Sequence, residues 1–254
     1  MHDVLEQLMT EPQAGDTFCG PPSNSEIPRT FGGHLLGQAL ASMAQTVSQE
    51  QVPLSFHSYF VAPGASSSAV EYYVERVRDG RSVSHRSVRG VQEGKTVFIG
   101  AAAFHRRDES GPRHSRSMPE LAGPEQPLPK DPPSSRAFLQ EWEDFDLRMV
   151  PGGVWMKHAP LQQDDLASHA VLLAYMSDMT LLHTALEGHP AAEVAMASLD
   201  HSLQFLDDFR VDEWLLFHTD SPHAAEGRAL THGSFFTSDG RLVAEVTQRG
   251  LTRH

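Results

Sequence analysis

Two stretches of the chain carry apolar residues at the spacing of a helix. In residues 31–47 apolar side chains recur every three or four positions from Leu35 to Ala44, which predicts an amphipathic helix. In residues 168–186 the apolar side chains are too dense for one narrow stripe, which predicts a largely buried helix. Asp178 lies in the middle of this second predicted helix. Because a buried ionised group is costly, Asp178 is either functional or a carboxylate at a helix surface or cap.

Runs with alternating polarity and high β-propensity predict strands around both helices. A short strand is expected ahead of each helix, at 16–20 and at 145–152. The strands expected after the first helix lie within 54–63, 69–80, 81–94 and 95–106. The strands expected after the second helix lie within 196–206, 212–222, 227–240 and 241–254. The chain is therefore predicted to be an α+β protein with antiparallel sheets.

The composition changes at residues 107–135. Proline, serine and charged residues dominate there without an apolar period, which predicts a linker. The order of predicted elements in residues 1–106 repeats in residues 136–254, and the dipeptide His-Ser recurs at 57–58 and 201–202. Such a repeat predicts two similar units, each with a sheet curled around a central helix.

Charge and composition exclude several classes of function. The 254 residues carry a net charge of −13, which argues against a nucleic-acid binder because such proteins depend on basic surface. The chain holds one cysteine and no apolar run of about 18 residues, so we expect no disulfide and no membrane-spanning helix. The N-terminus does not read as a signal peptide, and the fifteen histidines are scattered. A cytoplasmic protein without metal or cofactor is predicted.

Seven segments taken together resemble the acyl-CoA thioesterase II family, over residues 15–254. They are FGGHLLGQAL, SFHSYFVAPG, RDGRSVSHRSVRGVQEGK, YMSD, SLDHSLQF, DEWLLF and DGRLVAEVTQRGL, and they follow one another in the order typical of the family. The resemblance implies a double hotdog fold of two tandem units and hydrolysis of acyl-CoA to a free acid and CoA. It also implies a part in fatty acid and lipid metabolism and assembly into a homo-oligomer.

The resemblance also implies which residues are catalytic. The family assigns catalysis to an Asp, a Thr and a Gln that hold a water, and the matching positions are Asp178, Ser198 and Gln248, all in the second unit. Serine keeps the hydroxyl of the usual threonine but lacks the methyl group that restricts its rotamers. Asp178 is the base of the trio. The chain has no Gly-x-Ser-x-Gly elbow, which agrees with attack by water rather than a covalent acyl-enzyme.

Several other polar residues have two interpretations each. On a regular strand Asp200 would share a face with Ser198, as a rival base or as a partner of a backbone group. His34 is a weaker candidate for ligand contact. The arginines between positions 76 and 89 form either a dock for CoA phosphates or a solvated strand face. Cys19 is expected to be a packed thiol.

The glycine pair that opens the first helix, at 32–33, either serves packing or presents free N–H groups to an anion or a carbonyl oxygen. Two other functions compete with the thioesterase. A non-catalytic acyl-CoA-binding double hotdog remains open because serine replaces threonine. A hydratase is disfavoured, because Asp178 and His183 are five positions apart and share a helix face poorly.

Overall fold

The computed structural model describes residues 4–23, 25, 27–107, 110–126, 142–162, 165–187, 189 and 194–253. The first half of the chain holds two helices, α1 (Val4–Leu8) and α2 (Gly32–Ala44). Its strands are β1 (Glu11–Pro12), β2 (Thr17–Gly20), β3 (Gln51–Phe60), β4 (Val70–Arg78), β5 (Val83–Gln92) and β6 (Lys95–Arg106).

The second half repeats this order. It holds helix α3 (Leu166–Met176) and the 3₁₀ helix η2 (Leu181–Leu186). Its strands are β7 (Phe145–Val150), β8 (Gly153–His158), β9 (Ala195–Phe205), β10 (Leu215–Ala225), β11 (Arg228–Thr237) and β12 (Leu242–Arg253). Within the described ranges no helix is long and apolar enough to cross a membrane.

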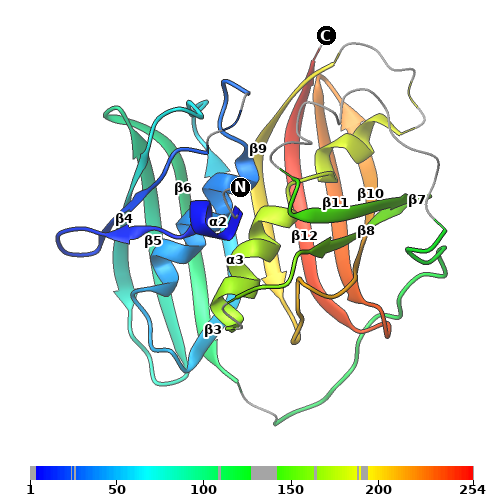
Figure 1. The fold of residues 1–254 in the computed structure, drawn as a ribbon, viewed down its shortest axis with the longest axis horizontal. Coiled ribbons are helices and arrows are strands. Elements are labelled where there is room, and N and C mark those ends of the chain that lie inside the picture. Colours follow the sequence, from blue (N-terminus) through cyan, green and yellow to red (C-terminus); the bar gives the residue numbers. More distant parts are fainter. Residues whose placement is uncertain are drawn as a thin grey trace.

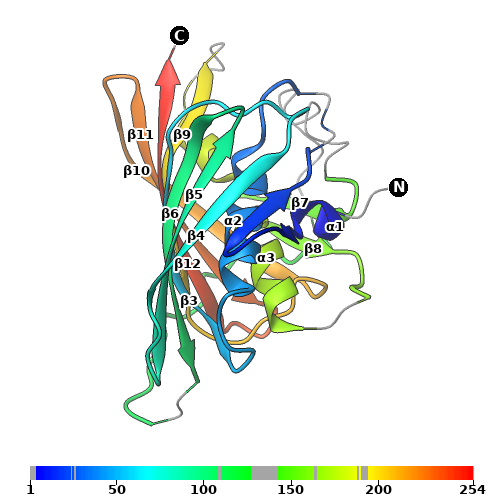
Figure 2. The ribbon, with the colours of Figure 1, turned by 90° about the vertical axis from the view of Figure 1, so that its left-hand side faces the viewer.

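All twelve strands belong to one antiparallel sheet in the order β1-β2-β4-β5-β6-β3-β9-β12-β11-β10-β8-β7. The order within the first half is repeated in reverse within the second, and β3 and β9 pair at the centre (Figure 1). The sheet curls around α2 and α3, which lie side by side on one face (Figure 2). The predicted α+β double hotdog is confirmed. The division into units at 1–106 and 136–254 stays a prediction.

The two His-Ser dipeptides meet at this central junction. His57 lies opposite Ser202 and Ser58 lies opposite His201. His57 is nevertheless exposed while His201 is buried, so the two histidines point to opposite faces of the sheet. The inward-facing counterpart of His201 in the first half is Phe56 rather than His57. The two His-Ser dipeptides are therefore shifted by one residue relative to each other in the structure.

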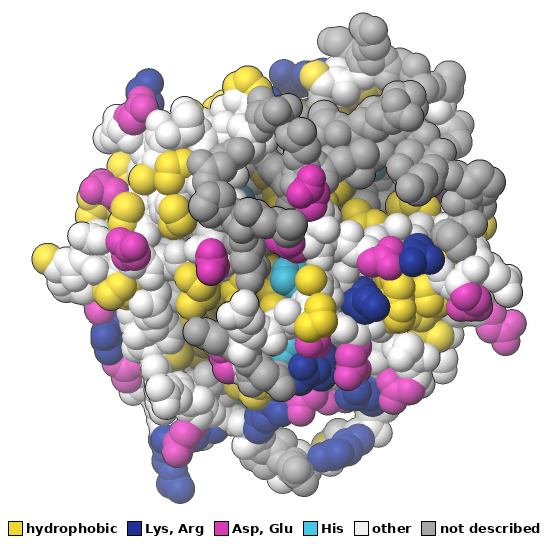
Figure 3. Space-filling model, in the orientation of Figure 1, with side chains coloured by type: hydrophobic (Ala, Val, Ile, Leu, Met, Phe, Trp, Pro, Cys, Tyr) yellow, Lys and Arg dark blue, Asp and Glu magenta, His cyan; other side chains and the backbone are white. Residues whose placement is uncertain are grey.

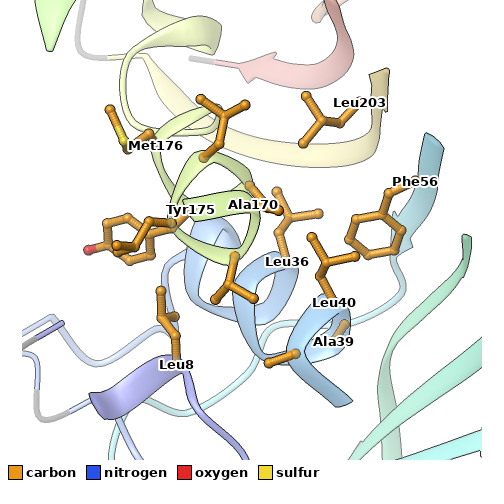
Figure 4. Packing of buried hydrophobic residues seen from close by; sticks show 14 of the residues in the cluster. Leu8, Leu36, Ala39, Leu40, Phe56, Ala170, Tyr175, Met176 and Leu203 are labelled. Carbon is orange, nitrogen blue, oxygen red and sulfur yellow. The ribbon is translucent and has the colours of Figure 1, made fainter. Parts of the chain in front are cut away.

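The main core lies between the two helices and the sheet (Figure 4). Leu36 and Leu40 of α2 and Met176 of α3 are fully buried there, with Phe56 of β3 and Leu203 of β9. Burying side chains of this size stabilises the fold by about 1.5–3 kcal/mol each. The dense apolar pattern of the second predicted helix is explained by this position, because α3 is covered on several sides.

The second predicted helix is shorter than its apolar pattern suggests. α3 ends at Met176, and Asp178 lies in the turn between α3 and η2 rather than within a helix. Ser177 caps the helix, since its Oγ donates to Ala174 O (2.8 Å) and lies 2.8 Å from His201 Nε2. This tertiary contact overrides the local pattern. Strand β8 was not predicted.

The described part of the predicted linker, residues 110–126, lies on the other face of the second half-sheet. Met118 and Leu121 pack on a small cluster that includes Trp155, and Trp155 Nε1 donates to Ala122 O (2.8 Å). Arg116 pairs with Glu245. Residues 116–122 therefore contact the outer face, while residues 110–115 are exposed. Residues 108–109 and 127–135 of the predicted linker lie outside the described residues.

Candidate active site

The three predicted catalytic residues come from three elements and meet at one place. Asp178 follows α3, Ser198 lies on β9 and Gln248 lies on β12. Gln248 Nε2 donates to Asp178 Oδ1 and also to Ser198 Oγ, and the Nε2–Oγ distance is 2.8 Å. Ser198 Oγ donates to Asp178 Oδ1 (3.3 Å). Asp178 and Gln248 are buried and Ser198 is half-buried, so the trio is a closed hydrogen-bonded group.

An irregularity in β9 turns Ser198 toward this group. His201 lies opposite Gln248, but Leu199 is an extra residue between the pairs Asp200–Arg249 and Ser198–Gly250. Side chains on a regular strand alternate between the two faces. Counting back from the inward-facing His201, Ser198 would point outward on a regular strand. The bulge reverses the alternation, and bulges of this kind re-aim side chains next to active sites.

Asp200 lies on the face opposite the trio. Its Oδ1 accepts the backbone N–H of Arg249 (3.0 Å). The expectation that Asp200 and Ser198 share a face assumed a regular strand, and it is wrong because Leu199 interrupts the alternation. Of the two interpretations, the partner of a backbone group is the one that the contacts support.

The first half of the chain supplies the N-terminus of α2 to the same place. The Asp178 carboxylate lies against the start of α2, where the backbone N–H of Gly33 favours its charged form. A Cβ at Gly32 would lie 2.5 Å from Asp178 Oδ2 and 3.0 Å from the ring of Phe60, so only glycine permits this approach. Free N–H groups and the partial positive charge of a helix N-terminus favour an anion. The glycine pair therefore serves both packing and carboxylate binding.

Two opposing effects set the acidity of Asp178. Burial raises the pKa of its carboxyl from 3.8 to about 7, because the charged form loses hydration. Hydrogen bonds from Gln248, Ser198 and the Gly33 N–H favour the carboxylate and work against this rise. The acid and its conjugate base are thus both populated near neutral pH, which is the condition that suits a general base.

His201 supports the turn that carries Asp178. Its ring is buried, and burial lowers its pKa to about 3, so the imidazole is neutral. Because Ser177 Oγ donates to Ala174 O, we assign the proton to His201 Nε2, which then donates to Ser177 Oγ (2.8 Å). The sequence marks His201 only as part of the repeated His-Ser dipeptide. Its contact with the residue before Asp178 depends on tertiary structure.

One acceptor of the trio is left without a protein partner. Gln248 Oε1 is buried and bonds to none of the residues that the structure describes. A buried amide oxygen in this state is costly, and such groups in native proteins usually have a specific explanation. It is therefore available to a hydroxyl or water that enters the group.

Two other candidate residues, His34 and Cys19, have structural surroundings. His34 is buried in α2 with Nε2 3.3 Å from Pro21 O, and burial lowers its pKa to about 4. Burial also raises the pKa of the half-buried Cys19 thiol. Both observations fit packed side chains. Within the described ranges no three His, Cys, Asp or Glu side chains gather as a metal site requires.

The arginines of the arginine-rich stretch differ in their surroundings. Arg86 is buried, and it donates to Thr46 Oγ1 (2.7 Å), to Thr46 O (2.8 Å) and to Asp79. Arg76 pairs with Asp16 at 2.8 Å. On the face of the molecule that carries the helices, acidic and basic side chains are interspersed (Figure 3). The docking hypothesis is therefore wrong for Arg86, which is a structural residue.

Two family models match the chain. A model described as acyl-CoA thioesterase N-terminal domain matches residues 21–105, and a model described as acyl-CoA thioesterase matches residues 146–251. Acyl-coenzyme A thioesterase 8 of Mus musculus is 34% identical over 98% of this chain and 87% of its own length. Acyl-CoA thioesterase 2 of Haemophilus influenzae is 30% identical over 100% of this chain and 98% of its own length.

Solved structures are similar in fold. The acyl-CoA thioesterase II TesB2 of Mycobacterium marinum has a TM-score of 0.88 at 38% identity, covering 99% of this chain and 98% of its own. A hot dog fold protein of Alicyclobacillus acidocaldarius has a TM-score of 0.79 at 19% identity, covering 100% and 99%. The second likeness supports the fold alone.

Proposed function

The chain belongs to the acyl-CoA thioesterase family, and from this premise we propose that it hydrolyses acyl-CoA with a water held by Asp178, Ser198 and Gln248. The products are a free carboxylic acid and CoA. Its relatives are named as thioesterases, and the chain is accordingly a thioester hydrolase.

One observation carries the proposal most strongly. A buried carboxylate with a pKa of about 7 is hydrogen-bonded to both other members of the trio, while Gln248 Oε1 keeps a free acceptor. A base must have a pKa near the working pH to accept a proton efficiently. The hydroxyl and the amide hold the carboxylate in place and offer further hydrogen bonds to a water.

The reaction then needs four movements of protons and bonds. Water donates one hydrogen bond to Asp178 and a second to Gln248 Oε1. Asp178 removes the first proton as the water oxygen attacks the thioester carbonyl carbon, which gives a tetrahedral oxyanion. The oxyanion collapses and breaks the C–S bond. The protonated Asp178 returns its proton to the CoA thiolate, so the enzyme ends as it began.

Ser198 takes the place of the threonine that is usual in the family. Its Oγ accepts from Gln248 and donates to Asp178, so the hydroxyl fulfils both functions without the methyl group. We therefore propose that serine supports the same chemistry.

Hydrolysis of an acyl-CoA length series by wild type, Asp178→Asn and Gln248→Ala tests the proposal. Loss of a general base lowers rates by about 10²- to 10⁴-fold, so we expect kcat of Asp178→Asn to fall within that range. Gln248→Ala should fall less, because the base remains. Asp220→Asn, at an exposed position of β10, is the matched control and should equal wild type.

Three outcomes would contradict the proposal. Asp178→Asn with wild-type turnover would remove Asp178 as the base. An acyl group trapped on the protein by acid quenching would replace direct attack by a covalent route. Binding of acyl-CoA without turnover by wild type would support the non-catalytic alternative.

We also propose that the protein is cytoplasmic and assembles as a homo-oligomer, as its resemblance to the family implies. Light scattering on the purified protein in solution measures its mass. A mass equal to one chain of 28.0 kDa would contradict assembly.

A further inference from the structure

We propose that Asp200 is a positioning residue, whose carboxylate fixes the bulge in β9 and so holds Ser198 on the inner face beside Gln248. The inference rests on the proposed function, because it assigns Asp200 a role in preparing that site. Asp200 touches none of the three residues of the trio.

The directions of the side chains on β9 show what the bulge does for Ser198. On β9, Leu203 and His201 are buried with one outward-facing residue between them. Continued alternation would place Leu199 inward and Ser198 outward. Ser198 nevertheless bonds to Asp178 and to Gln248. The inward position of its hydroxyl therefore depends on the extra residue.

An extra residue disrupts the ladder of backbone hydrogen bonds locally. At this point the Asp200 carboxylate accepts the N–H of Arg249 at 3.0 Å, on the exposed side of the sheet. Asp200 lies two residues after Ser198, and Arg249 directly follows Gln248. This one bond consequently ties the two strands together between their reactive side chains.

The alternative role for Asp200 is that of a base. The side chain lies on the face opposite Asp178 and its partners, so a proton from a water in the trio is out of its reach. The two roles differ in what they require. If Asp200 positions the bulge, its side chain needs an acceptor atom at the place of Oδ1. If Asp200 is a base, its side chain needs a negative charge.

Four variants separate these roles. Asp200→Asn keeps an acceptor oxygen in place and removes the charge, and we expect kcat within about threefold of wild type. Asp200→Glu keeps the charge but displaces the oxygens by one methylene, and Asp200→Ala removes the acceptor. For these two we expect kcat to fall about 10- to 100-fold, since small misplacements reduce rates by such factors, while KM changes less than about threefold. Asp220→Ala is the matched control and should equal wild type.

A double-mutant cycle with Ser198→Ala provides the readout that a general loss of structure would not give. If Asp200 acts through Ser198, Asp200→Ala should change kcat by less than about threefold once Ser198 is alanine, because coupled residues are not additive. Should Asp200→Ala fail to fold, the contrast between Asp200→Asn and Asp200→Glu still decides the matter.

Each contrary result has its own meaning. Asp200→Asn as inactive as Asp200→Ala would show that the charge is needed and would overturn positioning. Additive losses in the cycle would also overturn it. If Asp178→Asn is inactive while Asp200→Ala and Asp200→Glu equal wild type, this inference alone fails. If Asp178→Asn keeps wild-type activity, the proposed function fails first.

Discussion

The ends of the two central helices have similar positions and opposite chemistry. Gln45 and Thr46 follow α2, and the buried Arg86 guanidinium donates to both the carbonyl and the hydroxyl of Thr46. Ser177 and Asp178 follow α3, and a buried carboxylate there has a pKa of about 7. A cation at a helix C-terminus agrees with the helix dipole, whereas a buried carboxylate at the same place opposes it.

The neighbouring strands differ in the same way. Phe56 lies opposite Ala102 in the first half, as His201 lies opposite Gln248 in the second. Pro53 lies opposite Phe104, as Ser198 lies opposite Gly250. A methyl group and a proline ring thus occupy the places of the amide and the hydroxyl. The two halves thus share their architecture, while the hydrogen-bonded trio gathers beside the end of α3. Four measurements test this difference.

The largest expected effect is on stability at high pH. The folded pKa of Asp178, about 7, lies above the ordinary 3.8, so its ionisation opposes folding. This penalty is absent below the ordinary value, grows as the pH rises toward 7 and is complete above it. Asp178→Asn should therefore be about 2–4 kcal/mol more stable than wild type at pH 9. Urea unfolding across a pH series measures this.

Asp220→Asn is the control for that series and should follow wild type. A less stable Asp178→Asn at pH 9 would show that the carboxylate is a structural group, and the contrast between the helix ends would disappear.

The other helix end should respond in the reverse way to Arg86→Met. Removal of the guanidinium leaves Thr46 O without its donor, and unsatisfied buried groups cost about 1–3 kcal/mol each. We expect unfolding free energy to fall by about 2–3 kcal/mol, with kcat per folded molecule unchanged. Denaturant unfolding and turnover at low temperature measure both. Arg89→Met, at an exposed position on the same strand, is the control, and a selective loss of kcat in Arg86→Met would contradict a purely structural role.

The pH dependence of turnover should show the ionisation of Asp178. The base form is required, so kcat/KM should rise about tenfold per pH unit below pH 7 and level off above it. Initial rates with one acyl-CoA across pH 5 to 9 measure the profile. The residual activity of Asp178→Asn should lack the inflection. A wild-type profile that is flat across pH 7 would show that the ionisation of Asp178 does not control the reaction.

The smallest effect is expected for Ser198→Thr. The added methyl group restricts the side-chain rotamers while the hydroxyl keeps its two partners. In the acyl-CoA assay we expect kcat to rise, by no more than about threefold over wild type. A tenfold loss would mean that the site of this protein has closed around the smaller side chain.

The sequence predicted the regular elements well, because their signals are local. The strand expected at 95–106 has the observed bounds, and α2 lies within 31–47. The acyl-CoA thioesterase family and the double hotdog were also predicted, because their segments stand in order along the chain. Cytoplasmic location, homo-oligomeric assembly and the unit boundaries remain predictions.

The features that were missed depend on contacts between distant residues. The end of α3 is set by Ser177 bonding to His201, and an apolar pattern does not contain this bond. The bulge at Leu199 changes which face Ser198 occupies, although no residue type in SLDHS marks an insertion. The trio of Asp178, Ser198 and Gln248 came from the family resemblance, whereas the structure was needed to show that the carboxylate facing the predicted glycine pair is Asp178.

The junction between β3 and β9 has a consequence for how the protein folds. His57 and Ser202 bond across it although they lie 145 positions apart in the chain, and contacts of such long range form slowly in folding. The Gly33 amide meets Asp178 only when the two halves have docked. A chain with both half-sheets formed but separate would hold all three trio residues and lack the helix end that faces them. Recovery of activity during refolding should therefore lag behind recovery of secondary structure. The rate at which turnover recovers would then report the rate at which the two halves dock.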